Sequence, residues 1–123
     1  MTGKAYWAIF QYYDGKLNKM AFKKRPVLVI GKADDKDWVV LPISRVTRRE
    51  YLDSHYDFEM NVLSYPKMSL KQTSYVRTHK QTVLNEGEFS SCITDFRKEY
   101  QDAYIAIMAL VEEFQKDLIN KSI

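Results

Sequence analysis

The feature that most constrains the fold is an uninterrupted apolar run, "RPVLVI" (residues 25–30). The run has the length of a strand rather than that of a helix, and β-branched residues are enriched in strands. Because apolar side chains occupy consecutive positions, we expect protein to cover both faces of this strand. Pro26 fixes its own φ and restricts Arg25 to extended backbone. The run therefore predicts a buried strand that begins with a conformationally fixed arginine.

A second apolar run, "WVVLPIS" (38–44), predicts the neighbouring strand. Gly31 and the polar stretch "KADDKD" (32–37) supply the turn between the two runs. Pro42 favours an edge position or a bend for this strand, because proline cannot donate to a ladder. If the strands pair antiparallel through the turn, Arg25 and Ser44 lie at the same end of the sheet.

Three further segments also predict strands. "AYWAIFQYY" (5–13) is rich in aromatic residues and ends at Asp14-Gly15, a dipeptide suited to a tight hairpin turn. "HYDFEM" (55–60) alternates apolar and polar positions, as a half-exposed strand does. "TSYVRT" (73–78) is a short fifth segment of the same kind.

The last third of the chain predicts an amphipathic helix from residue 91 to about residue 119. Ser90 or Ser91 is the expected N-cap, and Asp95 complements the positive end of the helix dipole. The apolar positions recur at spacings of three and four, as a core-facing helix requires: Ile93, Phe96, Tyr100, Ala103, Ile107, Leu110, Phe114 and Leu118. We therefore predict one domain over residues 1–123: a mainly antiparallel, strongly curved sheet or barrel with a long C-terminal helix.

Composition excludes several classes of protein. The chain is 46% hydrophobic and 28% charged, a globular balance, and its net charge of +3 is a weak hint of an anionic partner. Cys92 is the only cysteine, and His55 and His79 are far apart, so we expect no disulfide, no metal site and no cofactor. The chain shows neither a signal-peptide core nor a membrane-length apolar stretch. We expect a soluble, cytoplasmic protein.

Basic residues from three segments are expected to surround Arg25 and Ser44. A planar guanidinium beside a hydroxyl is suited to binding a phosphate. The surrounding residues are Lys23, Lys24, Arg45, Arg48, Arg49, Arg77, His79 and Lys80. Ordinary explanations also exist: Lys23 and Lys24 suit a solvated strand end, Ser44 can simply end a strand, and Tyr75 suits the core or an interface.

The ordered set of these segments resembles the PemK/MazF family of toxin ribonucleases from toxin–antitoxin modules. "KRPVLVIG" (24–31) is similar to the family's Arg-Pro followed by a hydrophobic strand, and "VVLPISR" (39–45) to the next strand with its terminal serine or threonine. "SLKQTSYVRTHKQTVL" (69–84) resembles the segment in which a serine-containing strand leads to Arg-Thr and a turn. The resemblance covers most of the chain.

This resemblance implies an SH3-like barrel, usually a homodimer, that cuts single-stranded mRNA without a metal. The RNA 2′-hydroxyl is the nucleophile, and the products carry a 2′,3′-cyclic phosphate and a 5′-hydroxyl. Arg25 matches the strand-entry arginine that stabilises the charge, and Ser44 matches the hydroxyl that orients the phosphate. A cognate antitoxin protein is the implied partner. The RNA-binding residues are then expected to be Lys24, Arg45, Arg48, Tyr75, Arg77 and Asp14.

The general base is where the chain departs from the family pattern. The loop "DGKLNKMAFKK" (14–24) lacks the glycine-rich residues of many relatives. The Arg-x-Asp acid–base pair of one family branch falls near Gln72 and Ser74, and neither side chain can transfer protons. His79 and Asp14 are the titratable candidates, with His79 preferred near neutral pH. We expect Arg77 to keep the imidazole neutral.

Two other functions remain open. The first is a CcdB-like, non-enzymatic toxin that poisons gyrase, although the C-terminal "INKSI" shows no resemblance to the gyrase-binding end of those proteins. The second is a non-catalytic SH3-like nucleic-acid-binding module. A 2′,3′-cyclic phosphate on cut RNA separates both from an endoribonuclease.

Overall fold

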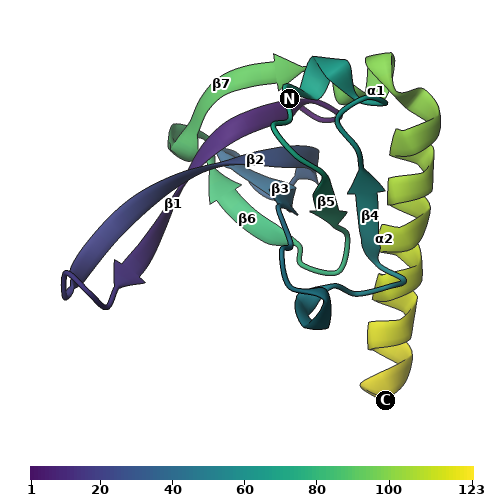
Figure 1. Cartoon of the computed structure of the whole chain (residues 1–123). Coiled ribbons are helices and arrows are strands. Elements are labelled where there is room, and N and C mark those ends of the chain that lie inside the picture. The colour runs from purple at the N-terminus through teal and green to yellow at the C-terminus, as the bar shows by residue number, and fades with distance from the viewer.

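A computed structural model describes all residues 1–123 as a curled antiparallel sheet with a long C-terminal helix (Figure 1). The hydrogen-bonded order of strands is β4-β5-β3-β2-β1-β7, and β6 pairs with β3 beside this path. The predicted mainly β architecture with a C-terminal helix is confirmed. The strands are β1 (Ala5–Asp14), β2 (Lys19–Lys32), β3 (Asp37–Ser44), β4 (Asp57–Met60), β5 (Ser74–Arg77), β6 (Thr82–Asn85) and β7 (Phe89–Thr94). The helices are α1 (Phe96–Glu99) and α2 (Gln101–Lys121), with 3₁₀ turns η1 (Arg49–Tyr51), η2 (Pro66–Met68) and η3 (Glu86–Glu88).

β3 is an interior strand, so of the two alternatives predicted for Pro42, an edge position or a bend, the edge position is wrong. β3 pairs with β2 along one side, with Val27 opposite Pro42. On its other side it pairs with β6 up to Val40 and with β5 from Ile43. Pro42 falls between these two ladders, where the chain changes partner and no registered partner lies beside it on that side. The missing N–H is tolerated at this position because neither ladder uses it.

The predicted burial of the apolar run 25–30 on both faces is confirmed at its centre, Val27–Val29, whereas the first half of β2 is mostly exposed. Leu28 packs in the larger core cluster with Leu41, Phe96 and Ile107, which lies between the sheet and α2. Val27 and Val29 point to the opposite face and belong to a second cluster. Alternating side chains point to opposite faces of a strand, so one short run contributes to two cores. This double burial fixes β2 and with it the position of Arg25.

The helix begins later than predicted, because residues 89–94 form strand β7. β7 pairs antiparallel with β1, with Tyr6 opposite Cys92. Ser90 and Ser91 are therefore strand residues rather than N-caps, and the side chain of Asp95 caps α1 by accepting from the Lys98 amide at 3.3 Å. Ile93 packs against the larger core cluster from a strand. Because Ile93 precedes Phe96 by three residues, its spacing matched the helical pattern and placed the predicted start of the helix too early.

The ends of the other elements shift by a few residues. Lys32 and Asp37 belong to strands, so the predicted turn at 32–37 is shorter, and β4 begins at Asp57 rather than at His55. β1 and β2 form a long hairpin whose far end projects from the body of the molecule (Figure 1). None of the helices combines the length and apolar character that crossing a bilayer requires.

Two isoleucines on α2 provide a test of the larger core. Ile107 is 0% exposed and Ile105 is 60% exposed. Ile107→Ala should lower the free energy of unfolding by about 2–5 kcal/mol, because it removes buried methylenes and leaves a cavity. Ile105→Ala should stay within about 0.5 kcal/mol of the parent. Urea denaturation followed by circular dichroism measures both, and equal losses in the two variants would contradict this packing of α2.

Candidate functional site

The pairing of β2 with β3 brings Arg25 and Ser44 together. Val27 lies opposite Pro42 in the antiparallel register, so Arg25 and Ser44 meet two residues further along each strand. Arg25 Nη1 donates a hydrogen bond to Ser44 Oγ at 3.3 Å, and both side chains are half-buried. The prediction that these residues share one end of the sheet is confirmed. The pair places a fixed guanidinium beside a hydroxyl.

A depression of about 430 Å³ opens on one side of this pair, and we call it the Arg25 depression. Five of its lining residues are cationic and none is acidic: Lys23, Lys24, Arg25, Arg45 and Lys71. Its other walls are formed by Trp7, Pro26, Ile43, Met68, Ser69, Leu70 and Ser74. The Lys24 ammonium lies 5.9 Å from the centroid of the Trp7 ring, a cation–π contact that holds the lysine over the apolar wall. An anion with a flat apolar portion suits these walls.

A second, smaller depression of about 330 Å³ is lined by Ser44, and we call it the Arg77 depression. Its cationic residues are Arg45, Arg48 and Arg77, and its other walls are Val46, Thr47 and Tyr51. Arg45 lines both depressions. The Arg25–Ser44 pair therefore contributes one residue to each, and the predicted residues Lys24, Arg45, Arg48 and Arg77 line one depression or the other.

Arg77 is held by a carboxylate that the sequence analysis did not single out. Arg77 Nε donates to Asp57 Oδ1 at 3.0 Å, and Nη2 donates to Asp57 Oδ2 at 3.2 Å. Arg77 Nη2 also donates to the Tyr51 carbonyl at 2.7 Å. The side chain of Asp57 is fully buried. A bidentate pair of this kind fixes both the position and the plane of the guanidinium.

His79 belongs to the same cluster and lines neither depression. Its Nδ1 lies 3.9 Å from Asp57 Oδ1, and its ring packs near Tyr56 and Phe114. Burial holds the pKa of the imidazole below its ordinary value; Arg77 acts in the same direction, whereas Asp57 opposes it. The predicted neutral form is thus supported, with burial rather than Arg77 as the main cause. The structure does not bring His79 to the Arg25–Ser44 pair, so proton transfer by His79 stays a prediction.

Two other predicted residues lie in different places. Asp14 is at the tip of the β1–β2 hairpin, where its carboxylate accepts hydrogen bonds from the Lys16 and Leu17 amides. Since Arg25 pairs with Ala8 on the same strand as Asp14, the hairpin separates the two by about 20 Å. The expectation that Asp14 is near the site is wrong. Tyr75 lies directly opposite Ser44 on β5, so it is a neighbour of the pair.

The site residues that the sequence analysis missed are Asp57, Lys71 and Trp7. Asp57 occupies a polar position of an alternating strand, which is the usual pattern of a solvent-facing residue. Lys71 follows a left-handed Ser69, in a loop without periodicity. Trp7 was the one of the three with a signal in the sequence. It is an aromatic residue in a predicted strand, and in the structure that strand pairs with β2 so that Trp7 lies opposite Pro26, next to Arg25.

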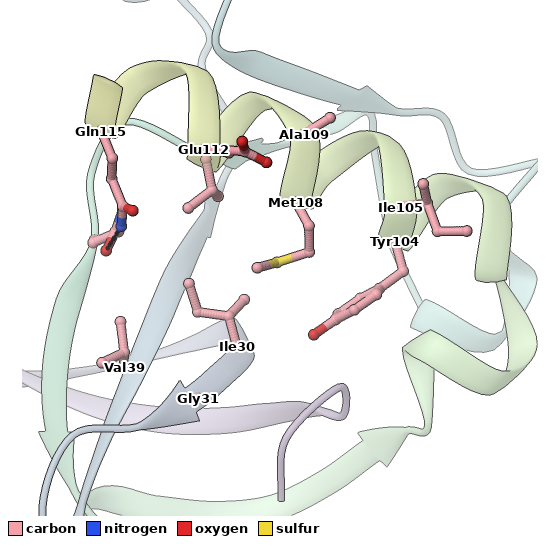
Figure 2. Close-up of a pocket in the computed structure, with 11 residues that line it drawn as sticks. Ile30, Gly31, Val39, Tyr104, Ile105, Met108, Ala109, Glu112 and Gln115 are labelled. Carbon is pink, nitrogen blue, oxygen red and sulfur yellow. Dashed lines mark hydrogen bonds between the residues drawn. The ribbon is translucent and has the colours of Figure 1, made fainter. Parts of the chain in front are cut away.

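The largest cavity, about 620 Å³, lies elsewhere, between α2 and the strands β2 and β3. Figure 2 shows Tyr104 and Met108 reaching from the helix toward Ile30. Glu112 is the only charged residue among those that line it. Its apolar walls offer neither a cation nor a nucleophile, so we place the candidate site at the Arg25–Ser44 pair despite the smaller size of the depressions there.

The chemistry available at the pair is anion binding and charge stabilisation. The chain places no group of three or more histidine, cysteine, aspartate or glutamate side chains where they would hold a metal ion. The positive charge that lines both depressions comes from arginines and lysines. A guanidinium retains its proton at all ordinary pH values, so Arg25 is suited to stabilising negative charge rather than to moving protons.

The lowered pKa of His79 predicts a loss of stability in mild acid. An unfolded histidine has a pKa of about 6.5. Because the folded value is lower, unfolding takes up a proton below this pH, and the stability present above pH 6.5 is lost as the pH falls. Thermal melts between pH 7.5 and pH 5.5 should show a falling midpoint in the parent protein and a flatter profile in His79→Gln. The exposed His55 is the control. If only His55→Gln flattened the profile, the acid sensitivity would come from His55, and its assignment to His79 would be contradicted.

No protein-family model matches the chain, and a search of curated proteins finds no similar sequence.

Proposed function

We propose that the protein is an endoribonuclease of the PemK/MazF type, the toxin of a type II toxin–antitoxin pair, built on an SH3-like barrel. The observation that carries this proposal is the hydrogen bond between Arg25 and Ser44 at the junction of two cationic depressions. This arrangement joins the two residues to which the family resemblance assigns the chemistry. An extended, polyanionic strand is the ligand that such a pair of depressions fits.

The proposed reaction is an intramolecular transesterification of RNA. The 2′-oxygen forms a bond to the adjacent phosphorus, and the bond from phosphorus to the 5′-oxygen breaks. The 2′-hydroxyl loses its proton and the leaving 5′-oxygen gains one, so the products are a 2′,3′-cyclic phosphate and a 5′-hydroxyl. Arg25 stabilises the charge that develops on the phosphate oxygens, and Ser44 orients the phosphate. His79 is the candidate proton acceptor, because its burial favours the neutral ring.

The proposed partners are a second copy of the chain and an acidic antitoxin. Several large apolar side chains on the projecting hairpin are more than half exposed, among them Tyr13, Met20 and Phe22. Surfaces of this kind are typical of interfaces, and they support the homodimer that the resemblance implies. An acidic, foldable antitoxin segment would bind the cationic depressions and cover Arg25.

One observation favours a second function, a non-catalytic nucleic-acid-binding module. No carboxylate and no imidazole lines either depression. A site that only binds RNA needs no general base. Binding of RNA without any cut product would favour this second function.

Arg25 is the residue whose replacement tests the proposed chemistry. Arg25→Ala should abolish cleavage of single-stranded RNA while the fold is retained, and Arg25→Lys should also fail because an ammonium lacks the guanidinium fork. Ser44→Ala should cost about 1–3 kcal/mol of transition-state stabilisation, the value of one hydrogen bond. Reactions run in excess chelator, with analysis of the 3′ ends for a 2′,3′-cyclic phosphate, measure these effects.

Lys32→Ala is the matched control for these variants, since it removes an exposed cation from β2 that lines neither depression. Its cleavage rate should equal that of the parent. Cleavage by Arg25→Ala at the parent rate would remove Arg25 from the chemistry, and loss of activity in chelator that magnesium restores would point to a metal-dependent nuclease.

His79 has a separate test, because proton transfer and packing predict different kinetics. If His79 accepts the proton, His79→Gln should lower the single-turnover cleavage rate by about 10²–10⁴-fold and leave RNA affinity nearly unchanged. The pH dependence of the rate should also lose its lower limb. A rate within a few-fold of the parent, with an unchanged pH profile, would restrict His79 to its packing contacts with Tyr56 and Phe114.

A further inference from the structure

We propose that Asp57 is a positioning residue that orients Arg77 toward a second phosphate, so that the site binds two neighbouring phosphates of one nucleic-acid strand. This inference rests on the proposed function for the class of ligand, a single-stranded nucleic acid. It assigns a role to Asp57 and a distinct binding position to the Arg77 depression.

The donors of Arg77 are divided between the protein and the depression. Nε and Nη2 are engaged by Asp57 and by the Tyr51 carbonyl. Nη1 makes no hydrogen bond within the chain, and it is not among the buried polar atoms without a partner, so solvent reaches it. Arg77 lines the depression beside Ser44. The two N–H groups of Nη1 are therefore the ones available to a ligand in this depression.

The Asp57 carboxylate that holds Arg77 is itself held in place by further hydrogen bonds. Asp57 is fully buried, and its Oδ2 also accepts a hydrogen bond from the Asp53 amide at 2.8 Å. The half-buried Asp53 in turn accepts the His55 and Tyr56 amides. A guanidinium held in this way loses little conformational entropy when it binds a ligand, whereas the exposed Arg48 side chain would have to be ordered first.

Arg77 adds little net charge to the depression; it contributes N–H donors with a fixed orientation. Its charge is balanced by Asp57, with the two side chains 15% and 0% exposed. Arg45 and Arg48 provide the uncompensated positive charge of the depression. The ion pair of Arg48 with Glu50 is 3.9 Å long between exposed side chains, so it neutralises little.

The spacing fits two phosphates of one strand. Tyr75 lies opposite Ser44, and Arg77 is two residues further along β5, about 7 Å from Tyr75 in the strand direction. One nucleotide of an extended strand spans such a distance. With one phosphate at the Arg25–Ser44 pair, the next phosphate along the strand falls in the Arg77 depression. A ligand with a single phosphate cannot use both positions.

Asp57→Asn separates positioning from charge. The substitution raises the net charge by one unit, so a purely electrostatic surface should bind a polyanion more tightly. If Asp57 positions Arg77, binding should weaken instead, by about tenfold, the loss expected for one hydrogen bond to a charged group. The probe is fluorescently labelled octathymidylate DNA, which has no 2′-hydroxyl and cannot be cut by the proposed route. Thymidine 5′-monophosphate is the single-phosphate reference, and its affinity should not change.

Arg77→Gln and Lys80→Gln form the matched comparison, because each removes one cation and Lys80 lines neither depression. Arg77→Gln should weaken octathymidylate binding about tenfold and reduce the salt slope by about 0.7, the value for one phosphate contact on a single strand. Lys80→Gln should leave both nearly unchanged. Equal effects of the two variants would overturn the inference.

Folding is checked by circular dichroism melts of every variant. If Asp57→Asn does not fold, Arg77→Lys provides the same contrast, because it keeps the charge and removes the free Nη1 donors. Octathymidylate binding by Asp57→Asn, or by Arg77→Lys, that equals or exceeds that of the parent would overturn the inference. Because the probe is not cleaved, this binding assay is independent of RNA cleavage. The binding results can therefore support the role of Asp57 even if the protein does not cleave RNA, and they can overturn that role even if it does.

Discussion

The antiparallel pairing of β2 with β3 is the interaction on which the rest of the structure depends. It fixes Val27 opposite Pro42 and thereby places Arg25 against Ser44 at the end of both strands. Side chains in consecutive positions of β2 pack into two different cores, so a slip of one residue would exchange the contents of both. The register is therefore strongly specified, and the geometry of the candidate site follows from it.

Much of this arrangement could be predicted from the sequence because it depends on local rules. An uninterrupted apolar run, a polar turn and a second apolar run are sufficient to predict an antiparallel pair, and Arg25 and Ser44 are found at its end. The start of the helix could not be predicted, because Ile93 packs into the core from a strand while keeping helical spacing with Phe96. The role of Asp57 depends on a contact with Arg77, twenty residues away in the chain, that no local pattern contains. Asp14 was misplaced because a long hairpin carries it away from the site.

The cationic lining of the Arg25 depression is difficult to explain by stability alone. Five cationic residues line it without a carboxylate, and like charges at short range repel one another. Arg77 shows the contrasting arrangement, in which a buried carboxylate compensates the guanidinium. Local rules are usually broken where function requires it. In the function proposed above, these two groups have different tasks within one site: the uncompensated cluster attracts an anionic strand, and the compensated arginine fixes its position.

The most direct test of the central claim is a crystal structure of the protein with a short RNA whose scissile nucleotide is 2′-deoxy. This substitution removes the proposed nucleophile and preserves every phosphate. The account predicts a phosphate within hydrogen-bonding distance of both the Arg25 guanidinium and Ser44 Oγ, at about 2.7–3.2 Å, with the 2′ position of the preceding sugar in line with the bond to be broken. An RNA bound in the apolar cavity beside α2, or with no phosphate at the Arg25–Ser44 pair, would contradict it.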